Sequence, residues 1–205
     1  MAGSASGIWD THLPFYLSAQ AMLFHLDRQG GGTFANMWLW GADHDVNTDA
    51  PIGTGAEGEC CSAWPSKHGF LATSSGQAWF YGVASEHSVD WAWNMHNASN
   101  IVLIGTPQTE HSPSALNVTG CDSIEIFGVL STAMHPDYYS NKGLTMPALI
   151  TLSNNSHSRL VAPNVCNSAM VLNSTDANMR VPGGTGFKGA IIAWDTEEEE
   201  RKPAR

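Results

Sequence analysis

The chain is poor in positive charge. Of its 205 residues only 9 are Lys or Arg, against 19 Asp or Glu, which gives a formal net charge of −10. Nucleic acids and anionic polymers are bound through basic tracks. We therefore exclude nucleic acid as a partner, whereas a neutral ligand is compatible with this charge.

Long apolar runs and metal-binding spacings are also lacking. No run reaches transmembrane length, so no membrane partner is expected. The 4 cysteines, at positions 60, 61, 121 and 166, contain no C-x-x-C pair, and the 9 histidines show no paired spacing. The sequence therefore predicts no metal site and no cofactor. Met1 is followed by small residues, without the basic and apolar regions of a signal peptide.

Other features favour an oxidising, secretory compartment. Charged residues make up only 14% of the chain, and N-x-[ST] sequons begin at Asn97, Asn117, Asn154 and Asn173. A disulfide between Cys121 and Cys166 is expected. The sequence thus predicts a secreted, extracellular glycoprotein, and the missing export signal indicates a fragment of a longer protein.

A repeat of 23 residues is the strongest structural signal. The apolar segments 78–82, 101–105 and 124–128 each end in glycine, and these glycines are 23 residues apart. A strand and a turn repeated at this interval are typical of a solenoid. We predict an all-β fold, a single-stranded parallel β-helix of roughly eight or nine coils.

The domain boundaries follow from this pattern. Residues 1–195 are predicted to form one partial β-helix domain, clearest over 78–130, and residues 196–205 to form a charged, disordered tail. Residues 1–18 are expected to be an irregular lead-in. Thr33 to Trp40 is expected to be one continuous strand.

Two carboxyl groups stand about one coil apart. Glu86 follows Gly82 by four residues, and Glu110 follows Gly105 by five. Neighbouring coils would bring them side by side, as glycoside cleavage by a general acid and a second carboxylate requires. The alternative is that both are solvated glutamates at turns.

Three segments carry a family resemblance. They read F-A-N-M-W-L-W-G-A-D-H-D (34–45), G-V-A-S-E-H-S-V (82–89) and Q-T-E (108–110). In order and spacing this pattern resembles glycoside hydrolase family 55, the exo-acting 1,3-β-glucanases or glucan 1,3-β-glucosidases, over about residues 20–130. The resemblance implies a right-handed, pectate-lyase-like β-helix that is the second of two tandem helices, with the N-terminal helix domain missing here.

The resemblance also implies a reaction. It is the inverting exo-hydrolysis of a neutral 1,3-β-glucan, a polysaccharide partner, with release of glucose. Glu110 maps to the proton donor, and Glu86 to a group that helps to hold the water. His87 and Gln108 adjoin these carboxylates and are candidate substrate-binding residues.

Tryptophans supply the remaining candidates for sugar contacts. Trp40, Trp91 and Trp93 are predicted to bind substrate, because indole faces stack on sugar rings; the alternative for each is core packing. His111, Ser112 and Pro113 follow Q-T-E where the family has aromatic residues, which points to altered or lost activity.

Two other functions are therefore kept open. One is a truncated, non-catalytic β-helix that binds carbohydrate or supports its recognition. The other is a polysaccharide lyase, which needs basic residues. It ranks last because residues 68–141 contain no Lys or Arg.

Overall fold

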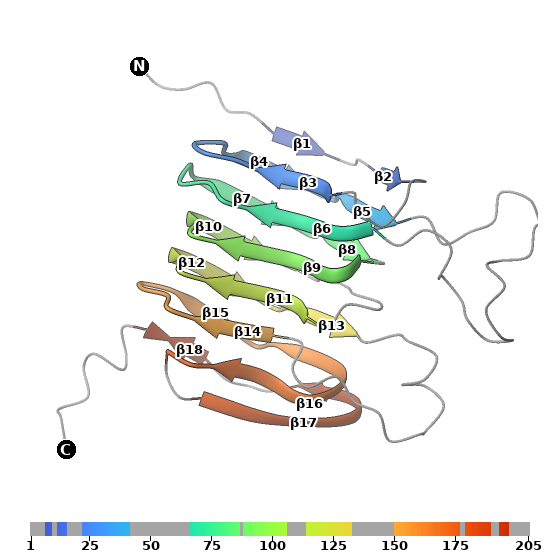
Figure 1. The fold of residues 1–205 in the computed structure, drawn as a ribbon, viewed down its shortest axis with the longest axis vertical. Helices are drawn as coiled ribbons and strands as arrows, with labels where there is room; N and C mark the ends of the chain where they lie inside the picture. Colours follow the sequence, from blue (N-terminus) through green and yellow to red (C-terminus); the bar gives the residue numbers. More distant parts are fainter. Residues whose placement is uncertain are drawn as a thin grey trace, which may run out of the picture.

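Stacked β-strands form the described part of the molecule. The computed structural model describes residues 7–9, 12–15, 22–41, 66–86, 88–105, 114–132, 150–176, 179–189 and 193–196. Within these ranges the strands lie in three sheets, and Figure 1 shows them stacked along the long axis of the molecule.

The three sheets have the following strands. The seven-stranded sheet contains, in spatial order, β1 (Gly7–Trp9), β4 (Gly32–Ala35), β7 (Ala78–Tyr81), β10 (Ser99–Ile104), β12 (Asp122–Phe127), β15 (Arg159–Val161) and β18 (Ala193–Asp195). The eight-stranded sheet contains β13 (Leu130–Thr132), β16 (Asn164–Ser174), β14 (Ile150–Ser153), β11 (Ser114–Thr119), β9 (Ser88–His96), β6 (Ser66–Ala72) and β3 (Met22–Leu26), with β17 (Met179–Gly189) beside β16. The three-stranded sheet contains β2 (His12–Phe15), β5 (Trp38–Gly41) and β8 (Ala84–Glu86).

From β1 to β13, successive strands of the chain belong to different sheets, and each pairs in parallel with a strand of a neighbouring layer. Ile101 of β10 is level with Ala78 of β7 on one side and with Ile124 of β12 on the other. The 23-residue interval of the sequence therefore corresponds to one layer, since it separates paired residues of neighbouring strands. The prediction of an all-β fold built from parallel sheets is confirmed.

The two ends of the stack differ from the prediction. β17 pairs with β16, and β18 with β15, in antiparallel orientation. At the other end, the segment expected to be an irregular lead-in contains β1 and β2, which pair in parallel with β4 and β5. Their shortness explains the error, since three or four residues give almost no alternation to recognise.

A column of left-handed residues turns the chain after β4, β7, β10, β12 and β15 of the seven-stranded sheet. The residues with positive φ at this turn are Asn36, Gly82, Gly105, Gly128 and Ala162. Glycine and asparagine adopt this conformation most readily. The turn at Asn36 (φ 52°) divides the expected strand 33–40 into β4 and β5, so the prediction of one continuous strand is wrong.

Aromatic rings fill the core of the first layers. Phe34 stacks on Phe80 with ring centroids 4.7 Å apart, and Phe70 lies 4.4 Å from Trp93. Phe80 also meets the edges of Phe70 and Trp93. The strands contribute these rings at register positions, so one buried aromatic column crosses several layers.

Aliphatic side chains take over in the later layers. The fully buried ones include Leu103, Leu116, Ile126, Leu152, Leu160 and Leu172. On the eight-stranded sheet a polar ladder accompanies them: Asn117 Nδ2 donates to Asn94 Oδ1 (2.8 Å), and Thr151 Oγ1 donates to Asn117 Oδ1 (2.9 Å). Each amide thus has a partner in the adjacent layer, as a polar group with little access to water requires.

Cys121 lies in this core as a free thiol, so the expected disulfide to Cys166 is wrong. Its Sγ accepts a hydrogen bond from the Ala98 N–H at 3.4 Å. Burial raises the pKa of the Cys121 thiol, against the smaller lowering effect of backbone hydrogen bonds. The residue acts as a small apolar side chain between two turns.

Candidate functional site

Glu86 ends β8, at the edge of the three-stranded sheet. Its register partner in β5 is Trp40, so two of the predicted site residues lie on adjacent strands. Leu39 and Ser85, which pair one position earlier, are fully buried. Since strand residues alternate between faces, half-buried Glu86 lies on the side away from the core.

Close packing against β6 supports the strand that carries Glu86. A Cβ added at Gly69 would lie 1.9 Å from Ser85 Oγ and 2.6 Å from the Ala92 carbonyl oxygen. Only glycine fits there, because backbone and a buried hydroxyl occupy the space of any side chain. This contact brings the backbone of β6 directly against the residue before Glu86.

The turns before the two predicted carboxylates are superposed in adjacent layers. A Cβ at Gly105 would lie 2.9 Å from the Gly82 nitrogen, and Gly82 N donates to the Ile104 carbonyl at 2.8 Å. The segments that lead to Glu86 and to Glu110 therefore leave equivalent turns. Glu110 itself, with Gln108 and His87, lies outside the described residues.

The predicted tryptophans have different environments. Trp93 is fully buried and belongs to the aromatic core, which leaves its indole no face for a sugar. Trp91 is half-buried and stacks on His68, with ring centroids 4.5 Å apart and planes within 15°. Trp40 is placed only by its pairing with Glu86.

Among the described residues, no group of three or more His, Cys, Asp or Glu side chains is arranged to hold a metal ion. In the same ranges no helix is long and apolar enough to cross a membrane.

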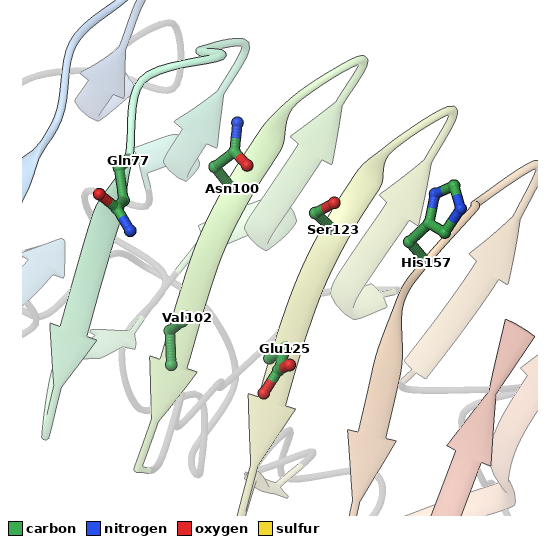
Figure 2. A pocket seen from close by; sticks show the side chains of 6 residues that line it. All are labelled: Gln77, Asn100, Val102, Ser123, Glu125 and His157. Atoms are coloured by element: carbon green, nitrogen blue, oxygen red, sulfur yellow. The ribbon is translucent and has the colours of Figure 1, made fainter. Parts of the chain in front are cut away.

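A groove lies on the outer face of the seven-stranded sheet, at residues that none of the sequence motifs includes. Figure 2 shows its lining: polar side chains in a row across neighbouring strands, with Val102 and Glu125 further along the two middle strands. The groove has a volume of about 390 Å³. The residues that line it are Gln77, Asn100, Val102, Ser123, Glu125 and His157. The 23-residue period already places positions 77, 100 and 123 at one level, and this signal could have revealed the row.

One end of this groove is organised around a carboxylate. Asp122 Oδ1 accepts hydrogen bonds from His157 Nδ1 (2.6 Å) and Ser156 Oγ (2.7 Å), and Asp122 Oδ2 accepts one from Ser123 Oγ (3.0 Å). The Ser156 hydroxyl, followed by His157, lowers the pKa of Asp122. These bonds orient the His157 ring from the Nδ1 side.

Comparison with known proteins gives partial matches. No protein-family model matches the chain. Over 101 residues, 49% of the chain, it is 34% identical to "Non-secreted LysM effector LysM15" of Penicillium expansum, of which the match covers 6%. Over 99 residues, 46% of the chain, it is 30% identical to "Probable glucan endo-1,3-beta-glucosidase" of Arthroderma benhamiae, of which the match covers 10%.

The chain thus spans a tenth or less of the length of these relatives. About half of it is similar in sequence to a protein described as a probable glucan endo-1,3-beta-glucosidase.

Proposed function

We propose that this chain is part of a hydrolase that acts on 1,3-β-glucan, of the type of glycoside hydrolase family 55. The parallel layers would be coils of one right-handed β-helix spanning residues 1–195. The observation that carries the proposal is the superposition of Gly105 on Gly82, because it starts the segments of Glu86 and Glu110 at equivalent places. The similarity to a probable glucanase supports the choice of substrate.

The proposed chemistry uses two carboxyl groups. Glu110 protonates the oxygen of the departing sugar, and Glu86 helps to orient a water on the opposite side of the sugar ring. Inverting glycosidases place such groups about 6.5–9.5 Å apart. Strands of adjacent layers are separated by about 4.8 Å. If the two side chains point in somewhat different directions, the distance between their carboxyl groups falls in this range. Trp40, Trp91, His87 and Gln108 are proposed to contact the sugar.

Glucose release from the 1,3-β-glucan laminarin tests this proposal. Glu110→Gln is expected to lower kcat by roughly 10²–10⁴-fold, because an amide cannot donate the proton. Asp27→Asn is a matched control, since Asp27 is an exposed turn carboxylate beside Arg28. Release that survives Glu110→Gln unchanged would remove Glu110 from the mechanism.

Product analysis separates the two modes of cleavage. Exo-hydrolysis yields glucose from the start, as the family resemblance implies, whereas endo-hydrolysis yields oligosaccharides. NMR of the first product reports whether the anomeric configuration is inverted, which the proposal requires. Early accumulation of oligosaccharides would favour the endo mode named for the Arthroderma relative.

A non-catalytic carbohydrate-binding role is the second candidate. It is favoured by the Penicillium relative, which is described as an effector rather than as a hydrolase. Retained binding of laminarin by a wild-type chain that releases no glucose would establish this role instead.

Secretion is also part of the proposal. Asn97 and Asn154 are exposed at turns, whereas the Asn117 amide is engaged in the polar ladder. Glycans are therefore expected at Asn97 and Asn154 and not at Asn117. Mass spectrometry of the protein purified from its own source, before and after glycan removal, measures this.

A further inference from the structure

The groove on the outer face of the seven-stranded sheet lies on a different sheet from β8. Its strands, β7, β10 and β12, form the middle of one sheet, whereas Glu86 lies on the three-stranded sheet. Its upper row consists of Gln77, Asn100, Ser123 and His157, one residue in each of four adjacent layers (Figure 2). A ligand that extends along the stack would meet a polar side chain in every layer.

These polar groups offer both donors and acceptors. Asn100 uses its Nδ2 for hydrogen bonds to the Ser75 carbonyl and to Ser99 Oγ, which fixes the amide. Ser123 Oγ donates its hydrogen to Asp122, so the lone pairs of this oxygen are left to accept hydrogen bonds from a ligand. The side chain of Gln77 is exposed. Amides and hydroxyls in this arrangement suit a ligand rich in hydroxyl groups.

Val102 is the apolar residue on the floor of the groove, and Glu125 lies beside it. Val102 is level with Trp79 on one side and with Glu125 on the other. All three are half-buried and face away from the core, since the alternate residues Ile101 and Leu103 are fully buried. Val102, with the indole of Trp79 next to the lining on the neighbouring strand, and the polar row match a pyranose, which has an apolar face and a hydroxyl edge.

Charge narrows the class of ligand. The lining contains one carboxylate, Glu125, and one imidazole, His157, and it includes no Lys or Arg. On a chain with a formal net charge of −10, an anionic ligand would be repelled. A neutral polyhydroxyl chain satisfies the polar row at no electrostatic cost.

We propose that this groove is a second, non-catalytic binding site for a neutral glycan chain lying across the strands. The strand spacing of about 4.8 Å is comparable to one sugar residue, so successive sugars meet successive layers. The choice of a 1,3-β-glucan as its ligand rests on the proposed function; the site itself does not use Glu86 or Glu110.

The test uses the full chain with Glu86→Gln and Glu110→Gln, so that a linear 1,3-β-glucan hexasaccharide is not consumed. Calorimetry measures its binding with and without Val102→Lys, which places a long charged side chain on the floor. We expect affinity to fall by roughly tenfold or more, since an apolar contact is lost and the groove is blocked. Val161→Lys, on the same face outside the groove, is the matched control. It is expected to bind the hexasaccharide as tightly as the protein that carries only Glu86→Gln and Glu110→Gln.

A second variant and a second measurement keep the result interpretable. If Val102→Lys does not fold, as judged by its melting curve, Gln77→Ala decides, because that side chain is exposed and its loss is expected to weaken binding several-fold. Amide NMR shifts on titration are expected at positions 77, 100, 102, 123, 125 and 157.

Several results would overturn the inference. In calorimetry, these are an absence of hexasaccharide binding or an unchanged affinity in the groove variants. In NMR, it is a set of amide shifts confined to the surroundings of Glu86. In sedimentation, it is a dimer that Val102→Lys dissociates. A wild-type chain that releases no glucose yet binds through the groove would instead refute the catalytic proposal alone.

Discussion

The first and the later layers of the stack share one backbone register but fill it differently. Between β3 and β9 the interior is an aromatic column that includes Phe70, Phe80 and Trp93. From β10 onward the buried hydrophobic side chains of the described residues are aliphatic except for Cys121, and the Asn94–Asn117–Thr151 ladder runs beside them. The comparison teaches that strand pairing sets the layer geometry, and that different side chains of suitable volume can occupy it.

The sharpest test of the aromatic column is Trp93→Ala. Trp93 is fully buried and contacts both Phe70 and Phe80, so its removal leaves a large cavity. We expect a loss of about 4 kcal/mol in the free energy of unfolding, measured by urea denaturation. Trp79→Ala, on the half-buried outer face of β7, is expected to cost less than half as much; equal losses would contradict a column confined to the interior.

The aliphatic layers are tested by Leu103→Ala. This side chain is fully buried on β10, and its removal is expected to cost about 3 kcal/mol. The next residue supplies the control, because Ile104 is 40% exposed and Ile104→Ala should change the free energy by about 0.5 kcal/mol or less. A larger effect at Ile104 than at Leu103 would reverse the assignment of inner and outer faces.

The polar ladder is tested by Asn117→Ala. The change leaves the Asn94 carbonyl and the Thr151 hydroxyl without their partner, and we expect a loss of about 2 kcal/mol. Thr151→Val removes only one of these bonds and is expected to cost about 1 kcal/mol. Thermal melting of both variants measures the difference, and an unchanged melting temperature for Asn117→Ala would show that the ladder adds no stability.

The smallest effect is expected at Asp122, on the outer surface. Its pKa is lowered from 3.8 in the folded state by the Ser156 hydroxyl first and His157 second. A lowered folded pKa means that the stabilisation is present above the unfolded value and is lost as the pH falls through the folded value. Because the side chain is 50% exposed, we expect less than about 1 kcal/mol.

The measurement is the difference in the free energy of unfolding between wild type and Asp122→Asn. It is expected to be constant above about pH 5 and to shrink below pH 3.8. A difference that grows as the pH falls would contradict the hydrogen-bonded carboxylate.

The sequence predicted the middle of this molecule better than its ends. Gly82, Gly105 and Gly128 revealed the layer interval because each occupies the same left-handed turn. Asn36 and Ala162 occupy that turn as well, but neither is glycine, so the pattern could not be followed to those layers. The antiparallel strands β17 and β18 carry no local signal of their direction, since orientation depends on which distant strand they meet.

The candidate site was predicted only in part, for a similar reason. The choice of Trp40 and Glu86 as site residues follows from motifs that the sequence shows, although their pairing on adjacent strands was not predicted. Burial of Trp93 does not, because a tryptophan on a strand is equally compatible with a sugar platform and with a core. The Asp122 carboxylate that orients His157 was invisible in the sequence, since the interval between these layers is 34 residues rather than 23.

The unequal layer intervals have an evolutionary consequence. In the seven-stranded sheet, paired residues of β4 and β7 are 46 apart in sequence, and those of β12 and β15 are 34 apart. The two pairs between them, β7 with β10 and β10 with β12, each have an interval of 23 residues. All of these strands nevertheless pair in one continuous ladder. The long connections precede strands of the eight-stranded sheet: one joins β5 to β6, and the other joins β13 to β14. Insertions and deletions can therefore accumulate before strands of that sheet, as Glu86 lies before β9, so that descendants diversify in specificity while inheriting the same scaffold.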